Sequence, residues 1–319
     1  MRTRFALTLA CASLLIAPSG IQSQSPGRLN PMIALHEQGK PVFGLYEPRA
    51  GGGRGGRGGD APVPTGESRA SETMAFKLSD FVFNGSMERS VERGMPQFLE
   101  YSAALLAAGA SAGTHPVVAK TANIARDAEA AVLNIGQQLN AGMSGIMFVG
   151  VESAEEVRLG IAAMRLQSNG GTRSNDVGPA AAYWGLTDDE YRQKADVWPL
   201  NPNGELINWT IVETQEGLDH VREIAAVEGV GVLWPGAGTL RGLFTTTGPD
   251  GQRALDAEAW EASIQLVLAA CKEFNVPCGY PANADDIEMR MEQGFSVFVM
   301  NWGDARFAAI EVGRRAAGR

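Results

Sequence analysis

The sequence predicts an α/β fold, a single TIM (β/α)8 barrel with eight parallel strands. Two observations support this prediction: eight short apolar or β-branched runs recur along the chain, and a helix-like segment follows each run. Eight such units in about 280 mature residues match a closed barrel better than an open sheet. A doubly wound sheet with a helical appendage is the alternative.

The predicted strands form two halves of four. They are residues 42–47, 80–85, 116–122 and 145–151, followed by 209–214, 230–236, 276–282 and 295–301. Between them, segments such as 153–166 and 256–274 carry apolar residues at intervals of three and four, which is typical of amphipathic helices.

Residues 1–23 have the features of a signal peptide. Two arginines precede an apolar run over residues 5–17, and Pro18 breaks the run. The run is too short to span a bilayer comfortably. We therefore expect cleavage near Ser23 and an exported protein, periplasmic or secreted. A retained anchor and lipidation at Cys11, which lies inside the run, are the weaker alternatives.

Behind the leader we expect an N-terminal lead-in over residues 24–41 and one barrel domain over residues 42–319. Residues 49–71 are rich in Gly, Pro and Arg and predict a flexible loop on the catalytic face. This loop is either a tolerated low-complexity insertion, which we prefer, or an arginine-bearing lid. Residues 167–205 form a second long connection, of the kind used for function or packing.

The composition excludes some classes of partner. A net charge of -9 and a pI near 5.0 argue against nucleic acid and against anionic membranes, so small molecules are the expected partners. Behind the leader only Cys271 and Cys278 remain. Two buried thiols are the preferred interpretation, although an oxidising compartment allows a disulfide.

In a barrel of this type the active site lies at the carboxyl ends of the strands. Polar residues occupy many of those positions. They are Glu47, Glu88, Arg89, Lys120, Thr121, Glu152, Glu213, Thr239, Arg241, Asn283, Asn301 and Asp304. The three histidines, His36, His115 and His220, precede strands or lie in a helix, and we interpret each as structural or solvated.

Seven segments occur in an order that is typical of one family: "FGLYE", "DFVFNGSMERS", "PVVAKTAN", "GIMFVGVESAEEV", "ADVWPLNPNGELINWTIVET", "VGVLWPGAGTLRG" and "AACKEFNVPCGYPAN". Over nearly the whole mature chain they resemble the HpcH/HpaI aldolase and citrate lyase family. The resemblance implies a TIM barrel that cleaves or forms carbon–carbon bonds next to a pyruvate-type 2-oxo acid. It also implies that the enzyme uses a divalent metal ion, Mg²⁺ or Mn²⁺. It also implies a homo-oligomer, a hexamer or a dimer.

The resemblance assigns roles to eight residues. "IVET" implies that Glu213 is a metal ligand, with Thr239 at the place of the second. The catalytic candidates are Glu88, Arg89 and Lys120. The candidates for substrate binding are Lys120, Trp234, Gly236, Ala237 and Thr239.

Four positions depart from the family pattern. Where the family has Asp-x-Glu-His after the second strand, with the histidine as acid/base, this chain has Ser86 and Arg89, although Glu88 is kept. Lys120 replaces an arginine and loses its bidentate fork. Thr239 replaces the aspartate that is the second metal ligand.

Two functions follow from this pattern. The first is a carbon–carbon lyase of the aldolase type acting on a small anionic 4-hydroxy-2-oxo acid through a metal-stabilised pyruvate enolate. The alternative is a catalytically reduced barrel that binds a small oxo or hydroxy acid without turnover. Retention of Glu213, Glu88 and Lys120 favours the first. The missing carboxylate at Thr239, together with the missing histidine at Arg89, favours the second.

Overall fold

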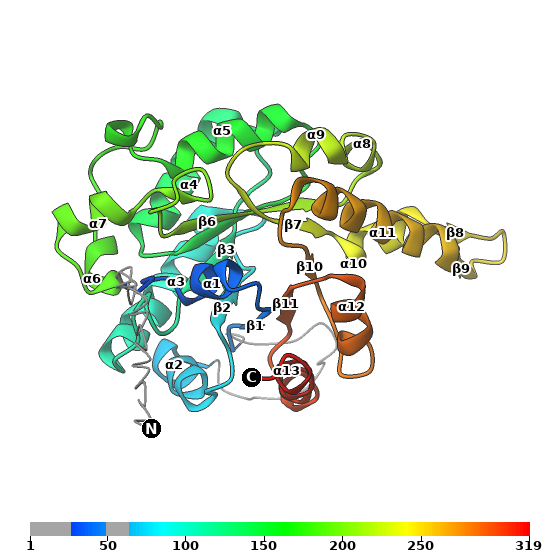
Figure 1. Cartoon of the computed structure of the whole chain (residues 1–319), viewed down its shortest axis with the longest axis horizontal. Coiled ribbons are helices and arrows are strands. Elements are labelled where there is room, and N and C mark those ends of the chain that lie inside the picture. The colour runs from blue at the N-terminus through cyan, green and yellow to red at the C-terminus, as the bar shows by residue number, and fades with distance from the viewer. Residues whose placement is uncertain (1–26, 49–63) are drawn as a thin grey trace, which may run out of the picture.

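The structure is a computed structural model that describes residues 27–48 and 64–319. A curved, wholly parallel sheet forms its centre, and helices cover the outside (Figure 1). The strands that correspond to the eight predicted runs are β1 (Val42–Tyr46), β2 (Phe81–Asn84), β3 (Val117–Lys120), β4 (Gly145–Phe148), β6 (Leu206–Val212), β7 (Val230–Pro235), β10 (Gly279–Tyr280) and β11 (Val297–Met300). All eight predicted strands are thus confirmed.

The order of the sheet is β10-β11-β1-β2-β3-β4-β6, and β6 also pairs with β7 and with the short β5 (Val197–Trp198). Between β7 and β10 a single parallel bridge joins Leu233 to Cys278, with the Leu233 N–H donating to Pro277 at 2.9 Å. The parallel α/β architecture is confirmed. Closure of the barrel at this seam stays a prediction.

The helices lie between the strands and outside the sheet. They are α1 (Pro31–Glu37), α2 (Gly66–Ala75), α3 (Val91–Ala107), α4 (Ala128–Asn140), α5 (Ala154–Met164), α6 (Ala180–Trp184), α7 (Asp188–Lys194), α8 (Gln215–Asp219), α9 (Val221–Ala225), α10 (Ala237–Leu243), α11 (Ala257–Phe274), α12 (Ile287–Gln293) and α13 (Asp304–Ala316), with a 3-10 turn at Gln167–Asn169. Side chains cap the longer ones: Ser90, Asp127, Ser153 and Asp256 accept N–H groups at the starts of α3, α4, α5 and α11.

The burial of the strands explains why their sequences are apolar. Every residue of β6 is buried, as expected for a parallel strand that is covered on both faces. Met32 and Ile33 of α1 belong to the inner apolar cluster that also contains Trp209, whereas a second, larger cluster fills the space between sheet and helices. The lead-in segment therefore packs into the interior of the sheet.

Two predictions need correction. Residues 66–71, expected at the end of a flexible loop, begin α2, because the Thr65 side chain accepts the Ser68 N–H and caps a helix. Residues 49–63 of that loop, like residues 1–23 of the expected signal peptide, lie outside the described residues. Cys271 and Cys278, expected as thiols, form a disulfide, because the end of α11 lies beside the start of β10 with a Cα–Cα distance of 5.7 Å.

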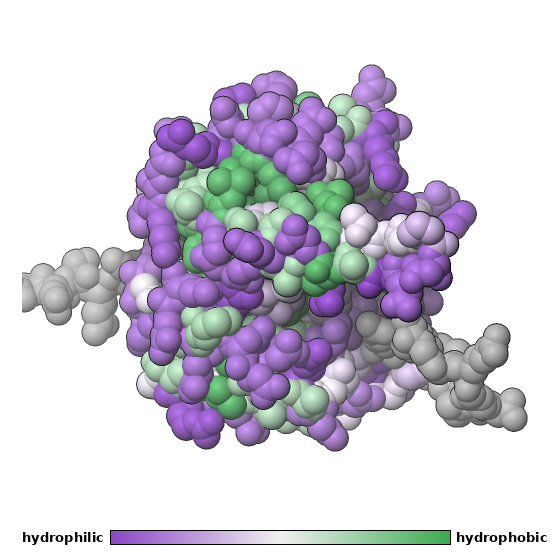
Figure 2. Space-filling model, turned by 90° about the vertical axis from the view of Figure 1, so that its right-hand side faces the viewer, coloured by the Kyte–Doolittle hydropathy of each residue, from purple (hydrophilic) through white to green (hydrophobic). Residues whose placement is uncertain are grey.

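An antiparallel hairpin, β8 (Thr245–Thr247) and β9 (Arg253–Leu255), projects from the body beside α11 (Figure 1). Apolar side chains gather on this side of the molecule (Figure 2). Leu243 of α10, Leu266 of α11 and Met289 of α12 are exposed large apolar side chains. Within the described residues, no helix is long and apolar enough to cross a bilayer.

His36 of α1 gives the stability a testable pH dependence. Its ring stacks on Trp198 at 5.8 Å, its Nε2 atom is buried without a hydrogen-bond partner, and burial lowers its pKa to about 4. In the unfolded chain the imidazole of His36 is protonated near pH 6.5. The contribution of His36 to the free energy of unfolding is therefore complete above that pH and is lost as the pH falls through about 4.

Urea unfolding of the native protein and of His36→Phe, each at pH 7 and at pH 4.5, tests this. The free energy of unfolding should fall less between pH 7 and pH 4.5 in the variant than in the native protein. Equal losses would contradict this assignment.

Candidate functional site

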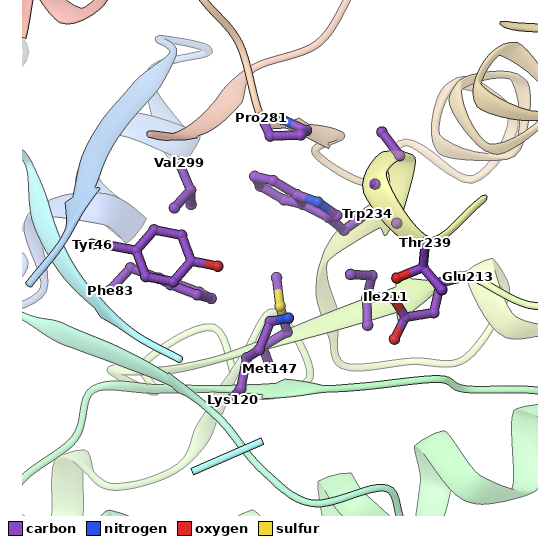
Figure 3. Close-up of a pocket in the computed structure, with 13 residues that line it drawn as sticks. Tyr46, Phe83, Lys120, Met147, Ile211, Glu213, Trp234, Thr239, Pro281 and Val299 are labelled. Carbon is purple, nitrogen blue, oxygen red and sulfur yellow. The ribbon is translucent and has the colours of Figure 1, made fainter. Parts of the chain in front are cut away.

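A cavity of about 190 Å³ opens at the carboxyl ends of the strands (Figure 3). Its walls combine apolar side chains with a few polar groups. They are Tyr46, Phe83, Lys120, Met147, Ile211, Glu213, Trp234, Gly236, Ala237, Gly238, Thr239, Pro281 and Val299. A cavity of this size accepts only a small molecule.

Aromatic packing fixes one wall of the cavity. Trp234 of β7 stacks on Trp209 of β6 at 5.8 Å, and Trp209 stacks on Phe83 at 5.9 Å. Gly279 faces Trp234 so closely that an added Cβ would lie 1.7 Å from the indole ring. The ring of Trp234 therefore has one place to lie, and the cavity is largely pre-formed.

Glu213 directly follows β6 and is 9% exposed. Among the described residues, none donates a hydrogen bond to its carboxyl group and none forms a salt bridge with it. A Cβ on Gly236 would lie 2.3 Å from the Cβ of Glu213, so only glycine leaves room for this side chain. A carboxylate that is nearly buried without a partner is costly. It is accordingly a candidate for binding a cation or for accepting a proton from a ligand.

Lys120 ends β3 and supplies the cavity's positive charge. Its Nζ lies 3.0 Å from Oε2 of Glu88, and their side chains are 14% and 40% exposed. Burial acts to lower the pKa of Lys120, but the negative charges of Glu88 and Glu213 and the hydrogen bond to Glu88 favour the ammonium, and this pKa is raised above its ordinary value. At neutral pH the group is therefore an ammonium that can bind an anion, and the free amine that a nucleophile requires is scarce.

A second cavity of about 820 Å³ adjoins the first, and both include Glu213 and Thr239. Glu88 and Arg89 line this second cavity, as does Glu152. The structure thus gathers all eight predicted site residues around two neighbouring cavities, while their roles stay predictions.

Other strand-end residues lie elsewhere. Arg241 is outside both cavities, with its guanidinium 5.6 Å above the ring of Trp260. No histidine lines either cavity. His220 is nevertheless nearer to the site than its position in the sequence indicated, because its Nδ1 lies 2.9 Å from the Glu152 carbonyl oxygen.

The sequence reasoning chose Glu47 at the end of β1 and missed Tyr46. Glu47 points away from the cavity, where Arg69 forms a salt bridge with it at 2.8 Å and Asn84 donates to the same oxygen at 2.8 Å. Tyr46 points into the cavity. Successive residues of a strand face opposite sides, so the alternation of β1 contained the signal.

Comparisons with known proteins agree with this geometry. A Burkholderia cenocepacia protein of the HpcH/HpaI aldolase/citrate lyase family has a TM-score of 0.60 at 20% identity, covering 88% of this chain and 94% of that one. Macrophomate synthase has a TM-score of 0.61 at 18% identity, covering 93% and 95%. This chain has the HpcH/HpaI aldolase fold.

The predicted resemblance to HpcH/HpaI aldolases is thus confirmed by the solved structures, and one relative with an aldolase name is similar in sequence. The hydroxypyruvate/pyruvate aldolase of Delftia acidovorans is 28% identical over 207 residues. The match covers 65% of this chain and 66% of that relative, just under two thirds of its length. No protein-family model matches the chain.

The divalent metal that the HpcH/HpaI resemblance implies needs hard, anionic ligands. Across residues 27–48 and 64–319, no group of three or more His, Cys, Asp or Glu side chains could hold a metal ion. Glu213 has the neutral Thr239 on its side of the cavity, and Glu88 is bound to Lys120. These side chains do not fit a metal centre built from protein carboxylates, and we derive no reaction step through a metal.

A substitution at Thr239 tests whether the site lacks a second carboxylate for binding a metal ion. Thr239→Asp should tighten Mn²⁺ binding by on the order of tenfold or more, because hard dications gain affinity with the charge of their ligands. Thr239→Asn is the matched control, since it supplies an oxygen of similar reach without charge. Calorimetric titration of the native protein and both variants measures the effect. Equal affinities for the aspartate and asparagine variants would show that a cation, if bound, lies away from Thr239.

Proposed function

We propose that this chain is a carbon–carbon lyase of the aldolase type that cleaves a small 4-hydroxy-2-oxo acid. One observation carries the proposal: an ammonium, Lys120, and the carboxyl group of Glu213, to which no described residue donates a hydrogen bond, line one small cavity at the carboxyl ends of the strands. The aldolase and lyase names of proteins with this fold support the reaction class.

The residues account for the chemistry in three steps. Lys120 binds the substrate carboxylate and lies close to the oxygen on C2. Glu213 takes the proton of the C4 hydroxyl, the C3–C4 bond breaks, and its electron pair forms an enolate between C3 and C2. The aldehyde half leaves, and the proton on Glu213 returns to C3 to give the 2-oxo acid, so that no proton is gained or lost overall.

The second cavity provides room for the aldehyde half. It adjoins the first at Glu213, the residue at which the bond would be cleaved. Arg89 is exposed at its edge, where a polar or anionic tail of the substrate would meet a positive charge. Longer and more polar substrates are therefore compatible with a small inner cavity.

A coupled assay tests the proposal. Purified protein is incubated with a panel of 4-hydroxy-2-oxo acids, with and without a chelator, and released pyruvate is followed with lactate dehydrogenase. We expect release from at least one substrate. Binding of the panel by calorimetry without any release would favour the alternative function, a barrel that binds a small acid without turnover, to which the neutral Thr239 points.

A further inference from the structure

Tyr46 lines the inner cavity, and the mechanism above gives it no role. It is the last residue of β1, and its hydroxyl points into the cavity from the wall opposite Glu213, with the amine of Lys120 between them (Figure 3). A phenol in this place can donate a hydrogen bond to a ligand atom.

The surroundings fix the ring of Tyr46. It packs edge-on against Phe83 of β2, with ring centroids 4.8 Å apart. A Cβ on Gly85 would lie 2.8 Å from Cε1 of the ring, so glycine provides the space that the ring occupies. The next residue, Glu47, is held by its N–H, which donates to the Phe83 carbonyl at 2.9 Å, and by its salt bridge with Arg69. A side chain held from several sides keeps its hydroxyl in one place, which electrostatic stabilisation requires.

Tyr46 and Lys120 both line the inner cavity, and Lys120 keeps its positive charge there because its pKa is raised above its ordinary value. The phenol and the ammonium thus act on the same part of the cavity. A phenol O–H and an ammonium are donors of the chain itself that can meet the negative charge of an enolate at this place.

We propose that the hydroxyl of Tyr46, together with the ammonium of Lys120, binds the oxygen on C2 of the substrate and stabilises the enolate that forms there. The inference rests on the proposed function and assigns it a further catalytic residue. When the C3–C4 bond breaks, the negative charge develops on the C2 oxygen, and the Tyr46 O–H donates to it without giving up its proton. Glu213 alone carries the proton from the C4 hydroxyl to C3.

Tyr46→Phe tests the proposal, because it keeps the ring on Phe83 and removes only the hydroxyl. We expect kcat for pyruvate release to fall by about 10²- to 10³-fold, as for the loss of one oxyanion donor, with KM changed by about threefold at most. The exchange of pyruvate methyl protons with D2O, followed by NMR, passes through the same enolate without bond cleavage and should fall by a similar factor. Tyr183→Phe is the matched control, since its hydroxyl donates to the His115 carbonyl at 2.8 Å, outside the cavity, and should leave both rates unchanged.

Binding of oxalate, a planar mimic of the pyruvate enolate, separates this inference from the proposed function. Tyr46→Phe should weaken oxalate binding by on the order of tenfold or more. Unchanged oxalate affinity, or kcat and exchange rates within about threefold of the native protein, would overturn the role of Tyr46 while leaving a lyase in place. Selective loss of oxalate binding in a protein that releases no pyruvate would support the oxyanion site and refute the lyase.

Discussion

Glu213→Gln is expected to lower kcat/KM for pyruvate release by about 10²- to 10⁴-fold, the range that a general base contributes. The amide keeps the size of the side chain but cannot accept the C4 hydroxyl proton. Folding should be preserved, because no described residue donates a hydrogen bond to the native carboxyl group. The coupled assay measures the rate, and circular dichroism and thermal unfolding check the fold.

Glu216→Gln is the control for this prediction. Glu216 is exposed in the first turn of α8, three residues beyond Glu213 and outside both cavities, so its loss should leave kcat/KM unchanged. If Glu213→Gln retained more than about a tenth of the native activity, the base would have to be sought elsewhere. Glu88 would be the next candidate, because it also lies beside Lys120.

Arg69→Met is expected to lower the free energy of unfolding by about 3 to 5 kcal/mol, the cost of removing one partner of a buried ion pair. Arg69 is 2% exposed; its Nε donates to the Pro48 carbonyl at 2.8 Å, and its guanidinium lies 4.6 Å from the centre of the Tyr101 ring. Its loss leaves Glu47 with a side chain that is only 12% exposed, and among the described residues Asn84 alone then donates to its carboxyl group. Burial already raises the pKa of Glu47, the sign of a charge that is expensive to keep there.

Urea unfolding measures the loss of stability in Arg69→Met, and two further variants serve as comparisons. Arg192→Met removes a partly exposed partner of the exposed Asp188 and Asp189 and should cost less than about 1 kcal/mol. The double variant Arg69→Met with Glu47→Leu should recover most of the stability, because an apolar pair replaces the charges. A loss for Arg69→Met no larger than that for Arg192→Met would show that the buried pair contributes little.

Much of the fold could be predicted, because parallel strands buried on both faces appear in the sequence as continuous apolar runs. β6 is the clearest example, with all seven residues buried. The β8–β9 hairpin was missed, since its residues are polar and largely exposed and have no apolar run to reveal them. α2 was missed because the Gly-rich composition of its neighbours outweighed a sound local signal, the N-cap at Thr65.

The candidate site was predictable in so far as it depends on strand ends. Glu213, Lys120 and Thr239 follow from that rule, and the structure adds the salt bridge between Lys120 and Glu88. Tyr46 was not found, because choosing between it and Glu47 requires the direction of each side chain. The disulfide could not be predicted, because it depends on how α11 packs on the sheet. The spacing of Cys271 and Cys278 in the sequence does not give this packing.

The neighbours of β1 constrain the order in which the chain can assemble. β1 pairs with β2 on one side and with β11, about 250 residues later, on the other. While the chain is being synthesised, β1 keeps one edge unpaired until residues 297–300 are available, and an unpaired edge invites association with other chains. Such long-range pairing is slow to form. We therefore expect β1 to become fully paired only after β11 has been synthesised, and we expect a partly synthesised chain to be more prone to aggregation than the whole chain.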